Sequence, residues 1–145
     1  MSKRVEVRIR PARPDEREHL EKLQWRASTA LPDYREQLEA NPDAIELPAE
    51  QIARGEVLVA EVDGHVAGFA AVIGGELDGL FVEPELWRNG IGAELVEAAA
   101  HEARRRGLAL SVTANPTALG FYERCGFSIE GEAQTRFGPA PRMSR

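Results

Sequence analysis

The segment from Leu80 to Leu95 constrains the fold more than any other stretch, because it predicts a strand, a tight turn and a helix in immediate succession. Leu80 to Val82 are strand formers, and Pro84 ends the strand because proline cannot donate a hydrogen bond to a neighbouring strand. The turn follows at 88–92, and helical spacing of apolar residues begins at Ile91. The first amides of a helix have no intrahelical acceptor, so this turn predicts a site for a phosphate or pyrophosphate.

Two glycines in this turn, Gly90 and Gly92, would let a ligand approach the backbone closely. An ordinary strand-to-helix turn explains the same two glycines, and the known nucleotide motifs fit poorly. A P-loop requires Gly-Lys followed by Ser or Thr, and no such run is present. A dinucleotide-binding fingerprint requires a third glycine at the position of Leu95.

Length, charge and cysteine content narrow the classes of partner. The chain has 145 residues, which predicts a single domain over 1–145 with one core. Its net charge of −6 argues against nucleic acid or an anionic membrane as the main partner. Cys125 is the only cysteine, so no internal disulfide is expected, and no apolar run is long enough to span a membrane. We expect a cytoplasmic protein.

Four strands are expected before the central turn. Period-two alternation predicts the first over Val5–Ile9. The pair Asp63-Gly64 is a strong hairpin signal between strands over 56–62 and 65–73, and a second glycine turn leads into a strand over 76–82. Three helices are expected in the first 55 residues. Helical spacing predicts the first over 14–27, a short second one over 33–40 lies in a less regular stretch, and a brief third over 48–55 ends at Gly55.

The alternation of the strand over 76–82 contains a break. Leu77 and Leu80 are three residues apart, which strict alternation places on opposite faces of the sheet. A β-bulge near Asp78-Gly79 would return both leucines to one face and bend the strand.

A parallel crossover is expected after the turn. The helix from Ile91 to about Arg106 leads into a strand over 108–113, an arrangement typical of a right-handed strand-helix-strand unit. Two parallel strands, one of them bent, leave a cleft between their carboxyl ends. A short helix over 117–124 and a strand over 127–129 follow. The tail, 135–143, contains two prolines, so we expect at most an edge strand there.

Four motifs carry a family resemblance. They are Leu80-Phe81-Val82-Glu83-Pro84, Arg88-Asn89-Gly90-Ile91-Gly92-Ala93, Asn115, and Phe121-Tyr122-Glu123-Arg124-Cys125-Gly126-Phe127. Each is weak by itself, but in this order and spacing they resemble the GNAT superfamily of acetyl-CoA-dependent N-acetyltransferases, over nearly the whole chain. The resemblance implies an α/β domain (α+β in some schemes), with a mixed, mostly antiparallel sheet of about six to seven strands splayed into a V and flanked by about four helices.

The resemblance also implies how a co-substrate would bind. Acetyl-CoA would lie in the gap of the V, with its pyrophosphate on the loop from Arg88 to Ala93 and no metal. Its pantetheine arm would pair with the strand backbone, as an extended amide-containing chain can at an open sheet edge. Trp87 stands where many members carry Gln or Arg. The implied coenzyme-binding residues are Leu80, Phe81, Val82, Arg88, Asn89, Gly90, Ile91, Gly92, Ala93, Asn115 and Tyr122.

Direct acyl transfer to an amine in a ternary complex needs a neutral amine and a proton for the leaving thiolate. By resemblance, Tyr122 matches the tyrosine that protonates the departing CoA sulfur, although packing of a short helix explains the same residue. A free alkylamine with a pKa of ~10.4 is protonated at pH 7, so a base must act. By resemblance, Glu76 is the candidate base, because some members of the superfamily carry a catalytic glutamate at this place, six residues before Val82. Asp78 and a water chain are alternatives, because the bulge leaves open which carboxylate faces the cleft.

The acceptor is the least constrained part of this interpretation. A small-molecule amine, a peptide N-terminus and a lysine side chain all remain open, as does a homodimer. In such a fold the region from about 27 to 47 would face the acetyl group, and nearby contacts would come from Trp25, Asp33, Tyr34 and Glu36. The alternative function is a non-catalytic acyl-CoA-binding sensor or protein-interaction module on the same fold.

Overall fold

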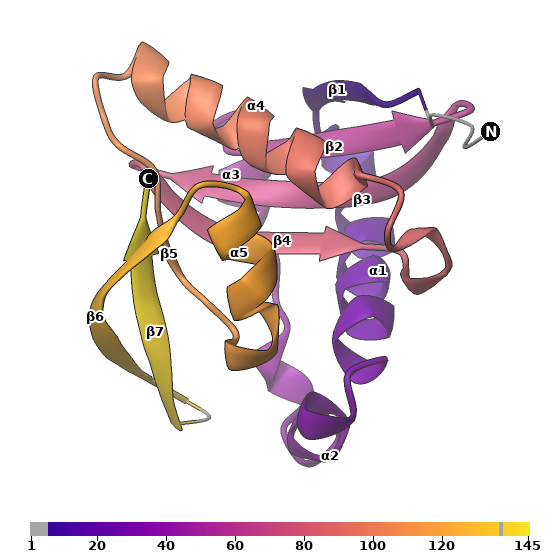
Figure 1. The fold of residues 1–145 in the computed structure, drawn as a ribbon. Helices are drawn as coiled ribbons and strands as arrows, with labels where there is room; N and C mark the ends of the chain where they lie inside the picture. Colours follow the sequence, from indigo (N-terminus) through magenta and orange to yellow (C-terminus); the bar gives the residue numbers. More distant parts are fainter. Residues whose placement is uncertain (1–5, 137) are drawn as a thin grey trace, which may run out of the picture.

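The computed structural model describes residues 6–136 and 138–145, without the side chains of Asp33 and Tyr34. In this part of the chain, seven strands form one mixed sheet in the order β1-β2-β3-β4-β5-β7-β6 (Figure 1). The strands are β1 (Arg8–Pro11), β2 (Val57–Val62), β3 (His65–Ile73), β4 (Glu76–Val82), β5 (Ser111–Thr113), β6 (Ser128–Thr135) and β7 (Gly138–Ser144).

Helices precede and follow the central meander. The described residues form five α-helices, α1 (Arg17–Thr29), α2 (Pro32–Ala40), α3 (Ala49–Ala53), α4 (Ile91–Arg105) and α5 (Leu119–Arg124). Four short 3₁₀ turns join them, η1 (Pro14–Glu16), η2 (Pro42–Ala44), η3 (Pro84–Leu86) and η4 (Pro116–Ala118). None of the helices in the described part is long and apolar enough to cross a membrane.

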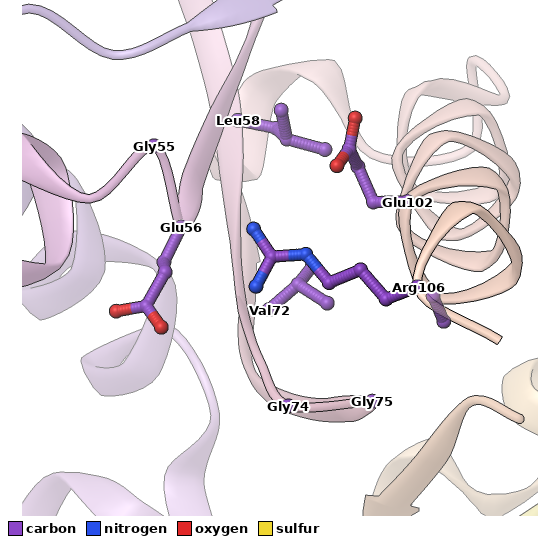
Figure 2. A pocket seen from close by; sticks show the side chains of 9 residues that line it. Gly55, Glu56, Leu58, Val72, Gly74, Gly75, Glu102 and Arg106 are labelled. Carbon is purple, nitrogen blue, oxygen red and sulfur yellow. The ribbon is translucent and has the colours of Figure 1, made fainter. Parts of the chain in front are cut away.

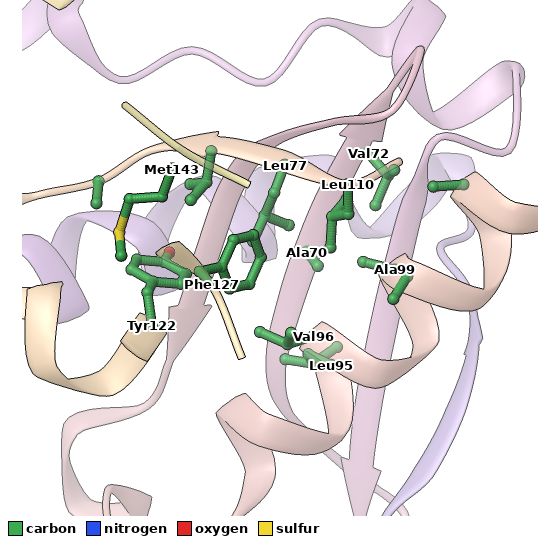
Figure 3. Close-up of a cluster of buried hydrophobic side chains, with 14 of the residues drawn as sticks. Ala70, Val72, Leu77, Leu95, Val96, Ala99, Leu110, Tyr122, Phe127 and Met143 are labelled. Carbon is green, nitrogen blue, oxygen red and sulfur yellow. The ribbon is translucent and has the colours of Figure 1, made fainter. Parts of the chain in front are cut away.

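The two faces of the sheet carry separate apolar clusters. On one face, α4 packs Leu95, Val96 and Ala99 against the sheet, and Figure 3 shows these side chains beside Leu77, Tyr122 and other buried residues. On the other face, α1 lies against β3 and β4, and Ile52 of α3 joins the same apolar cluster. That second cluster includes Leu20, Leu23, Ile52, Val57, Val59 and Phe69. The periodicity that predicted the helices therefore identified the residues that face the core.

The hairpin predicted at Asp63-Gly64 is confirmed. Both residues have positive φ, 53° and 77°, as a two-residue turn of this type requires. The turn at Gly74-Gly75 has the same character, with φ values of 54° and 81°. The two turns order β2, β3 and β4 as an antiparallel meander.

The predicted bulge in β4 is also confirmed. Leu77 pairs with Val72 and Gly79 pairs with Ala71, so Asp78 is an extra residue opposite a single step of β3. Leu77 and Leu80 consequently both contact the cluster under α4. The bulge bends β4 away from its next neighbour.

The sheet splits into a V beyond this bend. β4 and β5 run parallel, as expected for a crossover, but pair only at Glu76 with Ser111 and Leu77 with Val112. Among the described residues, the rest of β4 has no strand on that side, and β5, β6 and β7 turn away from the first four strands (Figure 1). The predicted fold class is confirmed, with one more α-helix than the four expected.

Three strands differ in extent from the sequence prediction. β1 begins at Arg8 rather than Val5, which lies outside the described residues. β5 is limited to Ser111–Thr113, because the Leu108 amide still closes the end of α4 by bonding to the Ala103 carbonyl. β6 extends to Thr135, well past the predicted end at 129.

The expectation that the tail is at most an edge strand is wrong, because β7 lies inside the sheet between β5 and β6. The carbonyl of Pro141 accepts a hydrogen bond from the Ala114 amide, so this residue turns its backbone polar side toward β5 rather than β6. Pro139 is two residues earlier and points the same way. The ladder with β5 starts only at Arg142, so neither proline removes a required donor from it.

Candidate functional site

A cleft of about 750 Å³ opens where β4 and β5 separate, a volume typical of cofactor and substrate sites. Its walls come from α1, α2 with η2, β4, the start of α4, η4 with α5, and the β6–β7 hairpin. Among the expected coenzyme-binding residues, those that line it are Leu80, Phe81, Val82, Arg88, Gly90, Ile91, Gly92, Ala93, Asn115 and Tyr122.

The start of α4 presents open backbone amides to this cleft. Gly90 caps the helix with φ of 81°, and no side chain caps it. Ile91, Gly92 and Ala93 line the cleft, and the first intrahelical bond runs from the Glu94 amide to the Gly90 carbonyl. The amides before Glu94 therefore lack intrahelical acceptors, and the positive end of the helix dipole favours an anion here.

The loop before α4 is held by two side chains. The indole nitrogen of Trp87 donates to the Val82 carbonyl at 2.8 Å, and the Asn89 amide nitrogen donates to the Leu86 carbonyl at 2.9 Å. Asn89 thus turns back onto its own loop and does not line the cleft. Arg88, with φ of 69°, lines it from the same loop.

The unpaired edge of β4 forms one long wall. After Leu77 no strand in the described part of the chain pairs with β4 on the cleft side, and Gly79 to Val82 all line the cleft. Backbone amides and carbonyls on such an edge need partners, so it suits an extended ligand that carries amide groups.

On the opposite wall, Asn115 follows β5. Its side-chain oxygen accepts from the backbone amide and the hydroxyl of Thr117, both at 2.9 Å. This arrangement caps η4 and leaves the Asn115 amide nitrogen available to the cleft.

Tyr122 lies on α5, with its ring held between two phenylalanines. Ring centroids lie 5.2 Å away for Phe121 and 5.4 Å away for Phe127, both in edge-to-face contact. The residue is 7% exposed, and burial raises the pKa of its phenol. Among the described residues its hydroxyl has no hydrogen-bond partner. Tyr122 therefore lines the cleft as a neutral phenol.

The bulge separates the two candidate carboxylates. Asp78 lines the cleft, and its pKa is raised by partial burial and by the neighbouring Glu76 charge. Glu76 does not line the cleft, and its Oε1 accepts from Nη1 of Arg142 at 2.6 Å. Of these two carboxylates, Asp78 is the one that lines the cleft.

The far end of the cleft is mostly apolar. It is lined by Gln24, Ala27, Ser28, Leu31, Leu38, Ala44 and Ile45 on one side and by Thr135 and Ala140 on the other. Arg136 joins the two sides, with Nη2 lying 3.0 Å from Asn41 Oδ1 and 3.1 Å from Asp43 Oδ1. The suggested contacts Trp25 and Glu36 do not line this end, and the side chains of Asp33 and Tyr34 lie outside the described residues.

Sequence reasoning assigned no role in the site to Arg124, which lines the cleft two residues after Tyr122. Its position within the same motif as Tyr122 was the available signal. It also assigned no role to Gln24 and Ser28, which line the cleft from α1. The sequence pattern of α1 identifies its apolar, core-facing residues and gives no signal for the polar residues that face the cleft.

A second cavity lies away from this cleft, at the far end of α4. Its volume is about 10 Å³, room for about one water molecule. Figure 2 shows the side chains of Leu58, Val72 and Arg106 crowding it, while the Glu56 carboxylate points away. The described residues contain no cluster of three or more His, Cys, Asp or Glu side chains that could hold a metal ion.

Comparison with known proteins agrees with this geometry. A family model described as "Acetyltransferase (GNAT) family" matches residues 17–127. A relative in Salmonella typhimurium, named peptidyl-lysine N-acetyltransferase YjaB, is 33% identical over 88% of this chain and 88% of its own. The solution structure of apo YjaB from Escherichia coli superimposes with a TM-score of 0.73 at 26% identity, covering 95% of this chain and 96% of that one. The PaiA N-acetyltransferase of Thermoplasma acidophilum, in complex with coenzyme A, gives a TM-score of 0.74 at 21% identity, over 97% and 99% of the two chains.

Proposed function

This chain belongs to the GNAT family of acetyltransferases, and on that premise we propose that it transfers the acetyl group of acetyl-CoA to a lysine side chain within a peptide. One observation carries the proposal. The open edge of β4, the free amides of α4 and the Tyr122 phenol all line a single cleft. These are the parts that an extended thioester with a pyrophosphate and a leaving thiolate requires.

The residues present fit the co-substrate. The amides of Ile91, Gly92 and Ala93 would hold the pyrophosphate, with Arg88 as a nearby cation. The edge of β4 beyond the bulge would accept the amides of the pantetheine arm, and the Asn115 side chain would donate to the arm from the other wall. The coenzyme A complex of PaiA, a neighbour in fold, supports this assignment.

The far end of the cleft supports a lysine side chain as acceptor. Leu31, Leu38 and Ile45 at this end would contact the methylene stem, and Asp78, at the bulge of β4, would meet the amine. The relatives named peptidyl-lysine N-acetyltransferase support the same class of substrate. A small polar amine would leave these apolar walls without a partner.

Two residues would carry the proton transfers. Asp78 takes a proton from the acceptor amine, whose nitrogen attacks the thioester carbonyl as a C–N bond forms. The C–S bond then breaks, and Tyr122 donates its phenol proton to the leaving thiolate. The nitrogen loses its second proton to solvent, from which Tyr122 regains one, and Asp78 releases its own, so the products are the acetylated amine, free CoA thiol and one proton.

The test is release of free CoA thiol from acetyl-CoA by the purified protein. The acceptors are a lysine-containing peptide blocked at its N-terminus, the same peptide with norleucine for lysine, and a polyamine. We expect release with the lysine peptide alone, and Tyr122→Phe should lower its rate roughly a hundredfold while acetyl-CoA still binds. Release with the polyamine alone would overturn the acceptor class. Bound acetyl-CoA without release to any amine would favour the sensor module.

A further inference from the structure

The side chain of Arg142 joins both arms of the V at its narrow end. Arg142 belongs to β7, and its Nη1 donates to Glu76 on β4 at 2.6 Å and to the Thr113 hydroxyl on β5 at 3.2 Å. Its Nε lies 4.0 Å from Glu130 on β6. One guanidinium therefore reaches side chains of β4, β5 and β6.

This contact lies where the strands part. The last ladder pair between β4 and β5 is Leu77 with Val112, and Thr113 is already paired with Arg142 of β7. Glu76 precedes Leu77, and Asp78, the bulged residue, follows it. The side chains of Arg142 and Glu76 are 32% and 33% exposed, so the ion pair is partly sheltered from water.

We propose that Arg142 and Glu76 form a positioning pair for Asp78. The pair sets the separation of β4 and β5 at the narrow end of the V, and it sets the net charge next to the Asp78 carboxylate. The inference rests on the proposed function, in which Asp78 is the base. Neither member of the pair lines the cleft, so neither touches the acceptor or the thioester.

Among the charged groups near Asp78, Glu76 is the one that raises its pKa. On the elements packed nearby, α1 presents Gln24, Ala27 and Ser28, which do not titrate, and α5 presents the neutral Tyr122. Two cations also line the cleft, Arg124 from α5 and Arg88 from the loop before α4. Beside burial, repulsion from Glu76 raises the pKa of Asp78. Arg142 neutralises part of that charge, since it bonds directly to the Glu76 carboxylate.

The test is a carbon-13 NMR titration of the Asp78 carboxyl group in the free protein. Glu76→Gln removes the repulsive charge and should lower the Asp78 pKa, whereas Arg142→Gln leaves Glu76 unneutralised and should raise it. Two charges ~7 Å apart on one strand interact by roughly half a pH unit in water. Arg142→Lys keeps the charge and should titrate close to the unmodified protein. The matched control is Glu102→Gln, which breaks a surface pair with Arg105 on α4.

Opposite shifts in Glu76→Gln and Arg142→Gln support the pair, because a purely structural role would not reverse sign. An unchanged Asp78 titration in both variants, or a shift in one direction, overturns it. Should Arg142→Gln fail to fold, the direction in Glu76→Gln decides, because the amide oxygen introduced by that substitution can still accept a hydrogen bond from Arg142. The titration needs no turnover, so this result is independent of the proposed function. Whether Asp78 is the base is tested separately, by measuring the turnover of the Asp78→Asn variant.

Discussion

The indole nitrogen of Trp87 donates a hydrogen bond to the carbonyl oxygen of Val82, at 2.8 Å. This contact joins the loop before α4 to the last residue of β4, so the two parts proposed to bind the pyrophosphate and the pantetheine arm are fixed relative to each other. The residue that departs from the pattern common in the family thus has a structural role at the coenzyme end of the cleft.

Trp87→Phe keeps a ring at this position and removes the donor. A hydrogen bond of this kind contributes about 0.5–1.5 kcal/mol, so we expect acetyl-CoA to bind roughly two- to tenfold more weakly, with a smaller effect on turnover. Isothermal calorimetry with acetyl-CoA measures the change. Trp25→Phe is the matched control, since the only other tryptophan does not line the cleft. Equal affinity of the two variants would contradict the role.

Gly92→Ala should weaken coenzyme binding without changing the stability of the fold. A Cβ at this position would lie 3.1 Å from the ζ carbon of Phe121, which lines the cleft beside Tyr122. Alanine favours the helix by up to about 1 kcal/mol, which offsets the strain, so the melting temperature should change little. Displacement of Phe121 should weaken acetyl-CoA binding by roughly 1 kcal/mol, about fivefold. Gly131→Ala, where a Cβ meets nothing within 4 Å, should change neither quantity.

Asp78→Asn should abolish a pH-dependent part of the activity. The base acts only when ionised, so activity should fall as the pH drops through the Asp78 pKa, which lies above its ordinary value of 3.8. In the variant, the rate should no longer fall in this way at acidic pH, and kcat/KM should be roughly a hundredfold lower. Profiles of rate against pH with saturating acetyl-CoA provide the measurement. Asp63→Asn, at an exposed hairpin turn that accepts asparagine, serves as control. If the rate of Asp78→Asn still fell at acidic pH, a water chain rather than Asp78 would be the base.

Glu16 should make the fold sensitive to acid. Its carboxylate accepts two hydrogen bonds from the Arg10 guanidinium, at 2.9 and 2.7 Å, and these lower its pKa from 4.5 to about 2. Because the folded pKa is depressed, this stabilisation is complete above about pH 4.5 and is lost as the pH falls through about 2.

Glu16→Gln should therefore lower the free energy of unfolding at pH 7 by roughly 1–2 kcal/mol, after allowance for solvent screening. The difference from the unmodified protein should shrink toward zero near pH 2. Urea unfolding at pH 7, 4 and 2 measures it. Glu18→Gln removes an exposed pair with Lys22 and should change stability little at any of these values. A constant difference across the range would show that the Arg10 contact is not ionic in origin.

Local patterns predicted much of the architecture. Only residues that tolerate positive φ make tight hairpins, so Asp63-Gly64 identified its turn. The three-residue spacing of Leu77 and Leu80 located the bulge at Asp78, because side chains alternate strictly along a strand. Gly90 marked the start of α4, and most of the residues expected to bind coenzyme line one cleft.

The three-dimensional arrangement decided what depends on distant partners. The prolines of the tail argued for an edge strand, yet β7 is interior, because β5 ends its ladder before reaching them. The choice between Glu76 and Asp78 was open in the sequence. Arg142, 66 residues away from Glu76, engages one carboxylate and leaves the other to the cleft.

The sequence by itself determined the elements, the turn types, the bulge and the opening of α4, because φ preferences and side-chain periodicity act within a few residues. Only the tertiary structure decided strand order, the apolar far end of the cleft and which carboxylate faces it. Those depend on contacts between segments far apart in the chain, whose energies are set by packing and charge in three dimensions rather than by local spacing.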